Sequence, residues 1–209
     1  MTYLQLEADV LDTYRRHEGL LTIGIDGLAG AGKSHLADCL ADRLRGDQIP
    51  VTLLRLDELI TPKACRYGTG QQEWFEYMYL QWDVKQLELS LFQPLQEKKR
   101  QLTLPYYDPE ADTIVYEQLQ LSASGILIIE GIFLQRPEWQ HKLDLTVYLD
   151  CPPPVRKRRA LKRDAYIGTL QERLRKYTHR YWPAEACYLR TCRPKQTADI
   201  VVLCEASLS

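Results

Sequence analysis

The sequence predicts an α/β fold in which a five-stranded parallel sheet carries helices on both faces. An apolar run at residues 20–25 leads through a glycine-rich loop into a helix with apolar periodicity. A second strand follows at 50–56, and this β–loop–α–β order favours parallel strands joined by right-handed crossovers. Apolar runs at 125–130, 143–149 and 199–203 supply three more strands. The first of these three is almost continuously apolar, as expected for a central strand that is buried on both faces.

Helices and one long excursion are predicted around this sheet. Residues 3–17 show the apolar spacing of a short amphipathic helix, and the apolar stripe after the glycine-rich loop ends at Gly46, a helix stop signal. About seventy residues separate the second and third strands, which is long for a connection in such a fold. We expect this excursion to hold two helices and a small hairpin, at 73–80, 83–96 and 102–116. No repeat or linker marks a second domain, so we expect a single domain over residues 1–209.

The composition limits the classes of protein to which the chain can belong. The formal net charge of -1 argues against a dedicated nucleic-acid-binding protein. No apolar run approaches the roughly 18–20 residues of a membrane-spanning helix, and residues 1–18 lack the pattern of a signal peptide. The six cysteines are scattered, which predicts reduced thiols and neither a metal site nor a disulfide framework. We therefore expect a cytoplasmic protein without nucleic-acid or membrane partners, and the sequence leaves open whether it forms a homo-oligomer.

The glycine-rich loop has the residue spacing of a phosphate-binding loop. Gly27-x4-Gly32-Lys33-Ser34 fits the Walker A pattern between a strand and a helix, the context that the pattern requires. Glycines let the backbone approach phosphate oxygens closely, and the unpaired N–H groups at the helix start favour an anion. Lys33 would reach the β- and γ-phosphates, and the Ser34 hydroxyl would bind Mg²⁺. The alternative is a glycine-rich turn that binds no ligand. It is disfavoured because the motif and its strand–loop–helix context agree.

The loop thus predicts the fold of P-loop-containing nucleoside triphosphate hydrolases and a site for a nucleoside triphosphate. We expect the nucleotide to contact a continuous segment of the chain, made up of Gly27, Leu28, Ala29, Gly30, Ala31, Gly32, Lys33, Ser34 and His35.

Three acidic residues end predicted strands, where ligands of open parallel sheets bind. Asp26 precedes the loop and is at least as typical of a turn-stabilising residue as of a catalytic one. Asp57 ends the second strand, where a carboxylate would accept a proton from an attacking hydroxyl, although it would also serve as a helix N-cap. Glu130 ends the most apolar strand, and since an unpaired buried acid is costly, we expect it to face the cleft and bind the metal.

Several segments follow one another along residues 20–203 in an order known from one kinase family. They are the phosphate loop, Leu56-Asp57-Glu58-Leu59, Pro105-Tyr106-Tyr107-Asp108, residues 129–133, a fourth strand with a following arginine-rich segment from Asp144 to Asp164, and residues 193–201. Together they resemble the uridine kinase branch of the P-loop small-molecule kinases, which also contains phosphoribulokinase and a bacterial type of pantothenate kinase. The phosphate loop is specific by itself, whereas the other segments gain their weight from their order.

The resemblance implies an ATP- and Mg²⁺-dependent kinase with a residue-by-residue division of roles. Lys33 and Asp57 would be catalytic, with Asp57 as the base that also contacts the acceptor. Two arginines of the lid, Arg159 and Arg163, would complete the catalytic set, and Ser34 would hold the metal together with Glu130.

The same resemblance implies where the acceptor binds. Tyr107 would pack at the substrate, and Asp83 would bind the ribose hydroxyls of a nucleoside. Residues 60–116 would form a substrate-side insertion and residues 152–180 a lid region. One departure bears on the substrate: Asp112 stands where the base-reading histidine of uridine kinases would fall.

We therefore predict transfer of phosphate to a hydroxyl of a small molecule, most plausibly a nucleoside. Another small alcohol, of the pantothenate or sugar phosphate type, is an alternative acceptor, and a regulatory ATPase without acceptor chemistry is an alternative function. A GTPase would need an Asn-Lys-x-Asp element, and the chain contains no asparagine. The basic run 155–163 is also typical of a solvated helix face, and the aromatic cluster 74–79 of local core.

Overall fold

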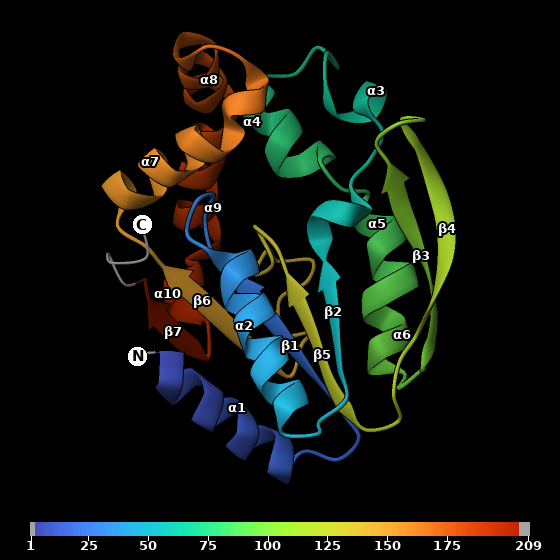
Figure 1. The fold of residues 1–209 in the computed structure, drawn as a ribbon. Helices are drawn as coiled ribbons and strands as arrows, with labels where there is room; N and C mark the ends of the chain where they lie inside the picture. Colours follow the sequence, from blue (N-terminus) through green and yellow to red (C-terminus); the bar gives the residue numbers. More distant parts are fainter. Residues whose placement is uncertain (1–2, 205–209) are drawn as a thin grey trace.

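The computed structural model describes residues 3–204 and contains the predicted parallel sheet (Figure 1). Its strands lie in the order β2-β5-β1-β6-β7, and every neighbouring pair is parallel. Their bounds are Leu20–Asp26 for β1, Val51–Arg55 for β2, Gly125–Glu130 for β5, Leu145–Asp150 for β6 and Ile200–Leu203 for β7. The predicted α/β class and the five-stranded parallel sheet are therefore confirmed.

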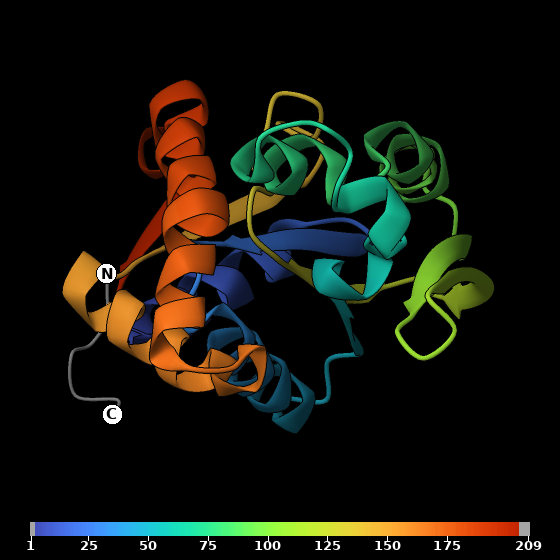
Figure 2. The ribbon, with the colours of Figure 1, turned by 90° about the horizontal axis from the view of Figure 1, so that it is seen from above.

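The two central strands, β1 and β5, are buried along their whole length because helices cover both faces of the sheet. Side chains of a strand alternate between its faces, so Ile128 of β5 joins one core cluster while its neighbour Ile129 joins the other. The first cluster includes α1 (Tyr3–Arg16) and α2 (Lys33–Gly46), and the second includes helices of the excursion and α9 (Trp182–Cys192). Figure 2 shows the sheet between these two helical layers.

The excursion between β2 and β5 contains the two predicted helices and the hairpin. The first helix consists of α4 (Glu73–Phe75) and a π-helical turn (Glu76–Leu80). The second runs through α5 (Val84–Leu87), a π-helical turn (Glu88–Phe92) and α6 (Gln93–Gln96). The hairpin pairs β3 (Gln101–Asp108) with β4 (Thr113–Gln120) in antiparallel register, as a separate small sheet at the side of the main one (Figure 1).

After β6 the chain is almost entirely helical. α7 (Pro153–Arg163) continues into a 3₁₀ turn (Asp164–Ile167), and α8 (Leu170–Lys176) continues through a π-helical turn (Tyr177–Tyr181) into α9. The short helices α3 (Lys63–Arg66) and α10 (Pro194–Thr197) complete the described chain. Within residues 3–204, no helix is long and apolar enough to cross a membrane, and all six cysteines are free thiols.

A buried ion pair joins the excursion to this helical region. The guanidinium of Arg180, which is 1% exposed, lies 3.0 Å from Glu76 Oε2 and also donates to the carbonyl oxygen of Arg66 at 2.9 Å. Burial opposes ionisation of Glu76, but hydrogen bonds from the N–H and hydroxyl of Thr69 and the charge of Arg180 outweigh it. The pKa of the Glu76 carboxyl is therefore held below its ordinary value of 4.5.

This lowered pKa predicts how stability depends on pH. An acid whose pKa is lower in the folded state stabilises the fold above its unfolded pKa, and this stabilisation is lost as the pH falls through the folded pKa. We expect Glu76→Gln to lower the free energy of unfolding at pH 7 and to reduce its decline as the pH falls from about 5 to about 3, measured by urea unfolding. Glu73→Gln, in the same helix but with a side chain that is 39% exposed, is the matched control and should keep the pH dependence of the wild type. Equal slopes in Glu76→Gln and the wild type would contradict the prediction.

Candidate active site

The phosphate loop connects β1 to α2 and depends on glycines whose φ angles are positive. Gly30 has φ +75°, and a Cβ there would lie 2.2 Å from the carbonyl oxygen of Arg156 in α7. Gly32, with φ +103°, stands directly before α2 as its N-cap, in the left-handed conformation. A side chain at Gly30 would therefore clash with the start of α7, so this glycine lets α7 pack directly on the loop.

Lys33 and Ser34 begin α2 and face the loop. The N-cap of this helix offers no side chain to its first N–H groups, which leaves the helix N-terminus to a ligand. Lys33 Nζ lies 3.5 Å from the carbonyl oxygen of Leu28, so the ammonium group is folded back over the loop. His35 is exposed one residue further on, beside the Cys39 thiol.

The ends of β2 and β5 bring carboxylates to the same place. Ser34 donates a hydrogen bond of 3.1 Å from Oγ to Glu130 Oε1, and Glu130 is 3% exposed. Burial raises the pKa of the Glu130 carboxyl, with the negative charge of Asp57 adding to the rise and the positive charge of Lys33 opposing it. Asp57 is exposed in a 3₁₀ turn, Leu56–Leu59, directly after β2. The structure thus gathers four of the predicted residues around the loop: Lys33, Ser34, Asp57 and Glu130.

The oxygens of Ser34 and Glu130 fit a magnesium site. Mg²⁺ prefers oxygen ligands and usually takes one or two from the protein, with substrate phosphates and water filling its octahedral shell. A hydroxyl and a carboxylate 3.1 Å apart beside a phosphate loop provide such a donor set.

Asp26 lies below the loop and is not exposed to the cleft. Its carboxylate accepts hydrogen bonds from Gly27 N at 2.7 Å, from Gln135 Nε2 at 3.0 Å and from the hydroxyl of Tyr188. Burial raises the pKa of Asp26 above its ordinary value, although these donors oppose the rise. The sequence allows Asp26 to be either a turn-stabilising or a catalytic residue. The structure supports the first role, because Asp26 fixes the backbone at the start of the loop.

A buried pair that the sequence reasoning missed joins the loop to α7 and α9. Glu185 of α9 is 1% exposed, accepts a hydrogen bond from Ala29 N at 2.9 Å and pairs with Arg156 Nη1 at 2.5 Å. Arg156 and Ala160, four residues apart on α7, form the buried face that meets Gly30. The sequence held one signal for Arg156. Ala160 follows it by four positions in the basic run, and this spacing places an apolar residue and an arginine on the same face of a helix.

Removing the Glu185 carboxylate should destabilise the protein because it leaves Arg156 buried without a counter-charge. Breaking a buried pair in this way costs about 3 kcal/mol or more. We expect Glu185→Ala to lower the free energy of unfolding by that amount, and Arg156→Met in the same chain to recover a large part of it. Urea unfolding of the two single variants and the double variant measures the coupling. Additive effects of the two substitutions would contradict the prediction.

The two arginines that the sequence placed in the lid do not contact the loop in this structure. Arg159 Nη1 lies 3.0 Å from the sulfur of Cys204, beyond β7. Arg163 pairs with the adjacent Asp164, at 2.6 Å from Nε to Oδ1, and the hydroxyl of Tyr177 donates to the same carboxylate. A catalytic role for Arg159 and Arg163 stays a prediction, and it requires their side chains to move toward the nucleotide.

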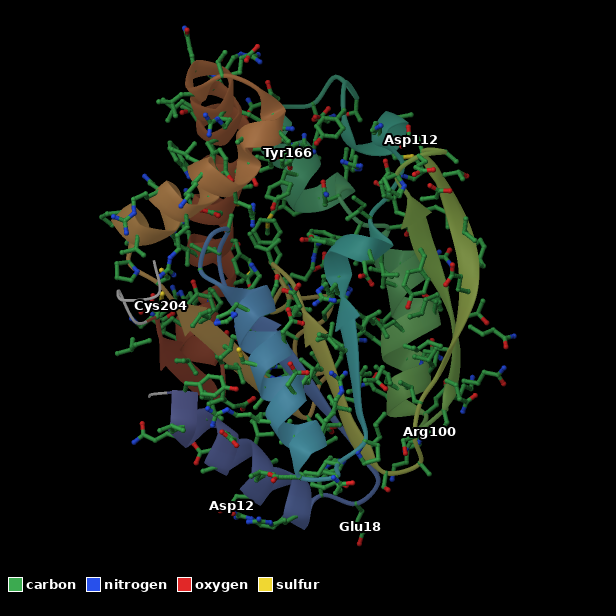
Figure 3. The ribbon with its side chains drawn as sticks, viewed as in Figure 1. Asp12, Glu18, Arg100, Asp112, Tyr166 and Cys204 are labelled. Carbon is green, nitrogen blue, oxygen red and sulfur yellow. The ribbon has the colours of Figure 1, made fainter. Side chains whose placement is uncertain are left out.

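The predicted acceptor residues have structural partners in the insertion. Asp83 caps α5 by accepting a hydrogen bond of 2.9 Å from Gln86 N. Tyr107 donates from its hydroxyl to Asp112 Oδ1 at 2.9 Å, and Lys63 N donates to the same oxygen at the same distance. Asp112, at the tip of the hairpin in Figure 3, therefore ties β3–β4 to the start of α3. Substrate contacts of Asp83 and Tyr107 stay predictions.

Two tyrosines lie within electrostatic range of Asp57. Burial raises the pKa of the Tyr77 hydroxyl well above 10, and the charge of Asp57 adds to the rise. The pKa of the Tyr166 hydroxyl is also raised, by partial desolvation and then by the charge of Asp164, with Asp57 as the smallest contribution. Tyr77 packs edge-on against Tyr181, with ring centroids 4.8 Å apart, whereas Tyr166 is 81% exposed in the 3₁₀ turn after α7 (Figure 3). The sequence interpretation assigned the aromatic cluster 74–79 to local core, and for Tyr77 it missed this proximity to the carboxylate.

Comparison with known proteins agrees with this geometry. A family model described as an AAA domain matches residues 23–174. A uridine kinase from Clostridium botulinum (strain Okra / Type B1) is 27% identical over 151 residues, which cover 68% of each chain. A possible uridine kinase from Bacillus stearothermophilus is 41% identical, with a TM-score of 0.78 over 95% of this chain and 98% of that one. The chain belongs to the AAA domain family and to the uridine kinase-like P-loop kinases.

As a uridine kinase-like protein, the chain is a small-molecule kinase with a P-loop nucleotide-binding fold. The fold extends to more distant kinases: D-glycerate 3-kinase from Cryptococcus neoformans aligns with a TM-score of 0.64 at 15% identity, over 87% of this chain and 86% of that one. At that identity the likeness concerns the fold alone. The phosphate loop, Asp57 after β2 and the Glu-Gly segment at the end of β5 lie together here, and these are the features that resemble uridine kinases. The acceptor side differs from that resemblance at Asp112.

Proposed function

We propose that this protein is an ATP- and Mg²⁺-dependent kinase that transfers the γ-phosphoryl group to a hydroxyl of a nucleoside-like acceptor. The observation that carries the proposal is the position of Asp57. Its carboxylate is exposed just after β2, near the hydrogen-bonded Ser34 and Glu130 and the phosphate loop. The curated relatives named uridine kinase support the same reaction class.

Each residue of this group has a defined task in the proposed reaction. The loop N–H groups and Lys33 bind the β- and γ-phosphates, and Ser34 and Glu130 would hold Mg²⁺. When bound, the metal ion neutralises charge on the phosphate oxygens. Asp57 orients the acceptor hydroxyl and takes its proton as the oxygen attacks the γ-phosphorus. The lid region 152–180 excludes water, so that the acceptor and not solvent is phosphorylated.

The acceptor side is formed in this proposal by the insertion 60–116 together with the lid. Tyr77 and Tyr166 lie near Asp57 from these two regions, which suits an acceptor with a planar ring beside its hydroxyl. Asp112 is held by Tyr107 and by a backbone N–H, and so replaces a base-reading histidine with a structural contact. This departure favours, as the second candidate, a small alcohol other than uridine.

A coupled assay of ADP release with MgATP tests the proposal directly. The acceptor panel contains uridine, cytidine, other nucleosides, pantothenate, ribulose 5-phosphate and related alcohols. We expect one acceptor to raise turnover well above the hydrolysis background. The phosphorylated product, identified by mass spectrometry, then shows which hydroxyl reacts. Nucleotide binding without stimulation by any acceptor would contradict the kinase proposal and favour a regulatory ATPase.

A further inference from the structure

Two cysteines lie side by side where β6 and β7 end. The parallel register pairs Asp150 with Leu203, so the following residues, Cys151 and Cys204, are the next neighbours. Cys204 N donates to the carbonyl oxygen of Asp150 at 2.8 Å, which extends the ladder to this position. Cys204 also contributes to the raised pKa of the Cys151 thiol, as expected for two thiols that lie close together. Neighbouring strands lie about 4.8 Å apart, within the range of Cα separations of about 4.4–6.8 Å that a disulfide spans.

The two thiols differ in surroundings in a way that suits stepwise oxidation. Cys204 is half-buried, and the guanidinium of Arg159 lies 3.0 Å from its sulfur. The attacking sulfur in disulfide exchange must be accessible to the small disulfide, and Cys204 is the more accessible of the two. Cys151 is buried, and burial raises the pKa of its thiol to about 12, with the contact to Cys204 adding to the rise. Cys204 is therefore the thiol that reacts first, and Cys151 is positioned to attack second.

We propose that Cys151 and Cys204 form a reversible disulfide by exchange with a small-molecule disulfide. The Cys204 thiolate attacks one sulfur of the small disulfide, forms a mixed disulfide and releases one thiolate. The sulfur of Cys151 then attacks the Cys204 sulfur, gives its proton to the departing thiolate and closes the protein disulfide. Two protein thiols are oxidised, and one small-molecule disulfide is reduced to two thiols. A small dithiol reverses both steps.

One cysteine of the pair, Cys151, lies beside the phosphate loop. Cys151 lines a cavity of about 120 Å³ together with Leu28 and Ala31 of the loop and Arg156 of α7. Three residues after Cys151 the chain is already in α7, whose Arg156 carbonyl leaves no room for a side chain at Gly30. Closing the S–S bond draws the sulfurs to about 2.05 Å and takes Cys204 away from Arg159. We therefore expect the oxidised protein to bind nucleotide more weakly, a consequence that rests on the proposed function of the loop.

Peptide mapping of the full chain tests the disulfide itself. After incubation with oxidised glutathione, mass spectrometry of the wild type and of Cys65→Ser should find the Cys151 and Cys204 peptides joined, and dithiothreitol should separate them. Cys151→Ser should stop at a glutathione adduct on Cys204, and Cys204→Ser should show no linked peptide. Cys65 is the matched control because it is exposed and lies in α3. A wild type that carries glutathione on Cys204 without the link, or that reacts only at Cys65, would overturn the proposal.

Nucleotide affinity tests the consequence separately. We expect the dissociation constant of a non-transferable ATP analogue, AMP-PNP with Mg²⁺, to rise about fivefold or more on oxidation of the wild type. The same treatment should leave Cys204→Ser unchanged. A linked protein with unaltered affinity would overturn this coupling while the kinase proposal stands. Failure of the reduced wild type to bind the analogue would instead contradict the proposed function, and the peptide map would still decide whether the disulfide forms.

Discussion

Replacing Lys33 with alanine is expected to lower kcat/KM for MgATP by about a factor of 10²–10³ or more, the loss seen when one preorganised donor is removed from a developing charge. Lys33 places its ammonium group against the phosphate loop, where Nζ already lies 3.5 Å from the Leu28 carbonyl oxygen. Lys33→Arg should recover little of this loss, because the guanidinium is a broader, planar group that the compact loop does not match. Steady-state kinetics with the acceptor identified by the panel measures the effect.

An exposed lysine provides the control for the Lys33 variant. Lys99 pairs with Glu97 on the surface beyond α6, and Lys99→Ala should keep the kinetic constants of the wild type. Circular dichroism and urea unfolding should show that Lys33→Ala is folded, since its side chain makes no buried ion pair. Turnover of folded Lys33→Ala within about threefold of the wild type would contradict the role of Lys33, given that a donor of this kind contributes far more.

The parts of the site that depend on local sequence were predictable. The phosphate loop was identified from residues 27–34 because its glycines, lysine and serine act through backbone geometry within one short segment. Asp57 and Glu130 were linked to it because the carboxyl ends of parallel strands meet at one edge of a sheet. In the sheet register, Glu130 at the end of β5 is paired with Ile25 of β1 on one side and with Arg55 of β2 on the other. β5 therefore places this acid between the ends of β1 and β2.

The parts that depend on packing between distant segments were not predictable. Glu185 reaches the loop from 156 residues further along the chain, and Tyr188 reaches Asp26 from 162 residues away. No spacing rule links such positions. The basic run of α7 indicated arginines near the loop, but only the contact of α7 with Gly30 shows that Arg156 faces it and that Arg159 faces Cys204. From the sequence, Asp112 was interpreted as the replacement of a substrate-binding residue. Its structural role, as the acceptor of a hydrogen bond from Lys63 N, depends on a segment that lies far away in the chain.

Asp57→Asn is expected to lower kcat by about 10²–10⁴-fold, the usual contribution of a positioned general base, and to leave nucleotide affinity close to that of the wild type. An asparagine keeps the size of the side chain and can still orient the acceptor hydroxyl, but its amide does not take the proton. The separation of kcat from affinity follows from the structure, because the phosphates are assigned to the loop and Lys33, and Asp57 lies in a different segment after β2. Acceptor-stimulated turnover and AMP-PNP binding, measured on the same preparation, provide the two quantities.

The neighbouring residue makes this test specific. Glu58 is an exposed carboxylate in the same 3₁₀ turn, so Glu58→Gln changes the local charge by the same amount without removing the proposed base. If the Asp57 effect arose from electrostatic attraction of Mg²⁺ or from stability of the turn, the two variants would lose activity to similar extents. A base at Asp57 alone predicts a large loss in Asp57→Asn and turnover within about threefold of the wild type in Glu58→Gln. Unchanged turnover in Asp57→Asn would exclude this residue from the chemical step and direct the search for a base to the tyrosines beside it.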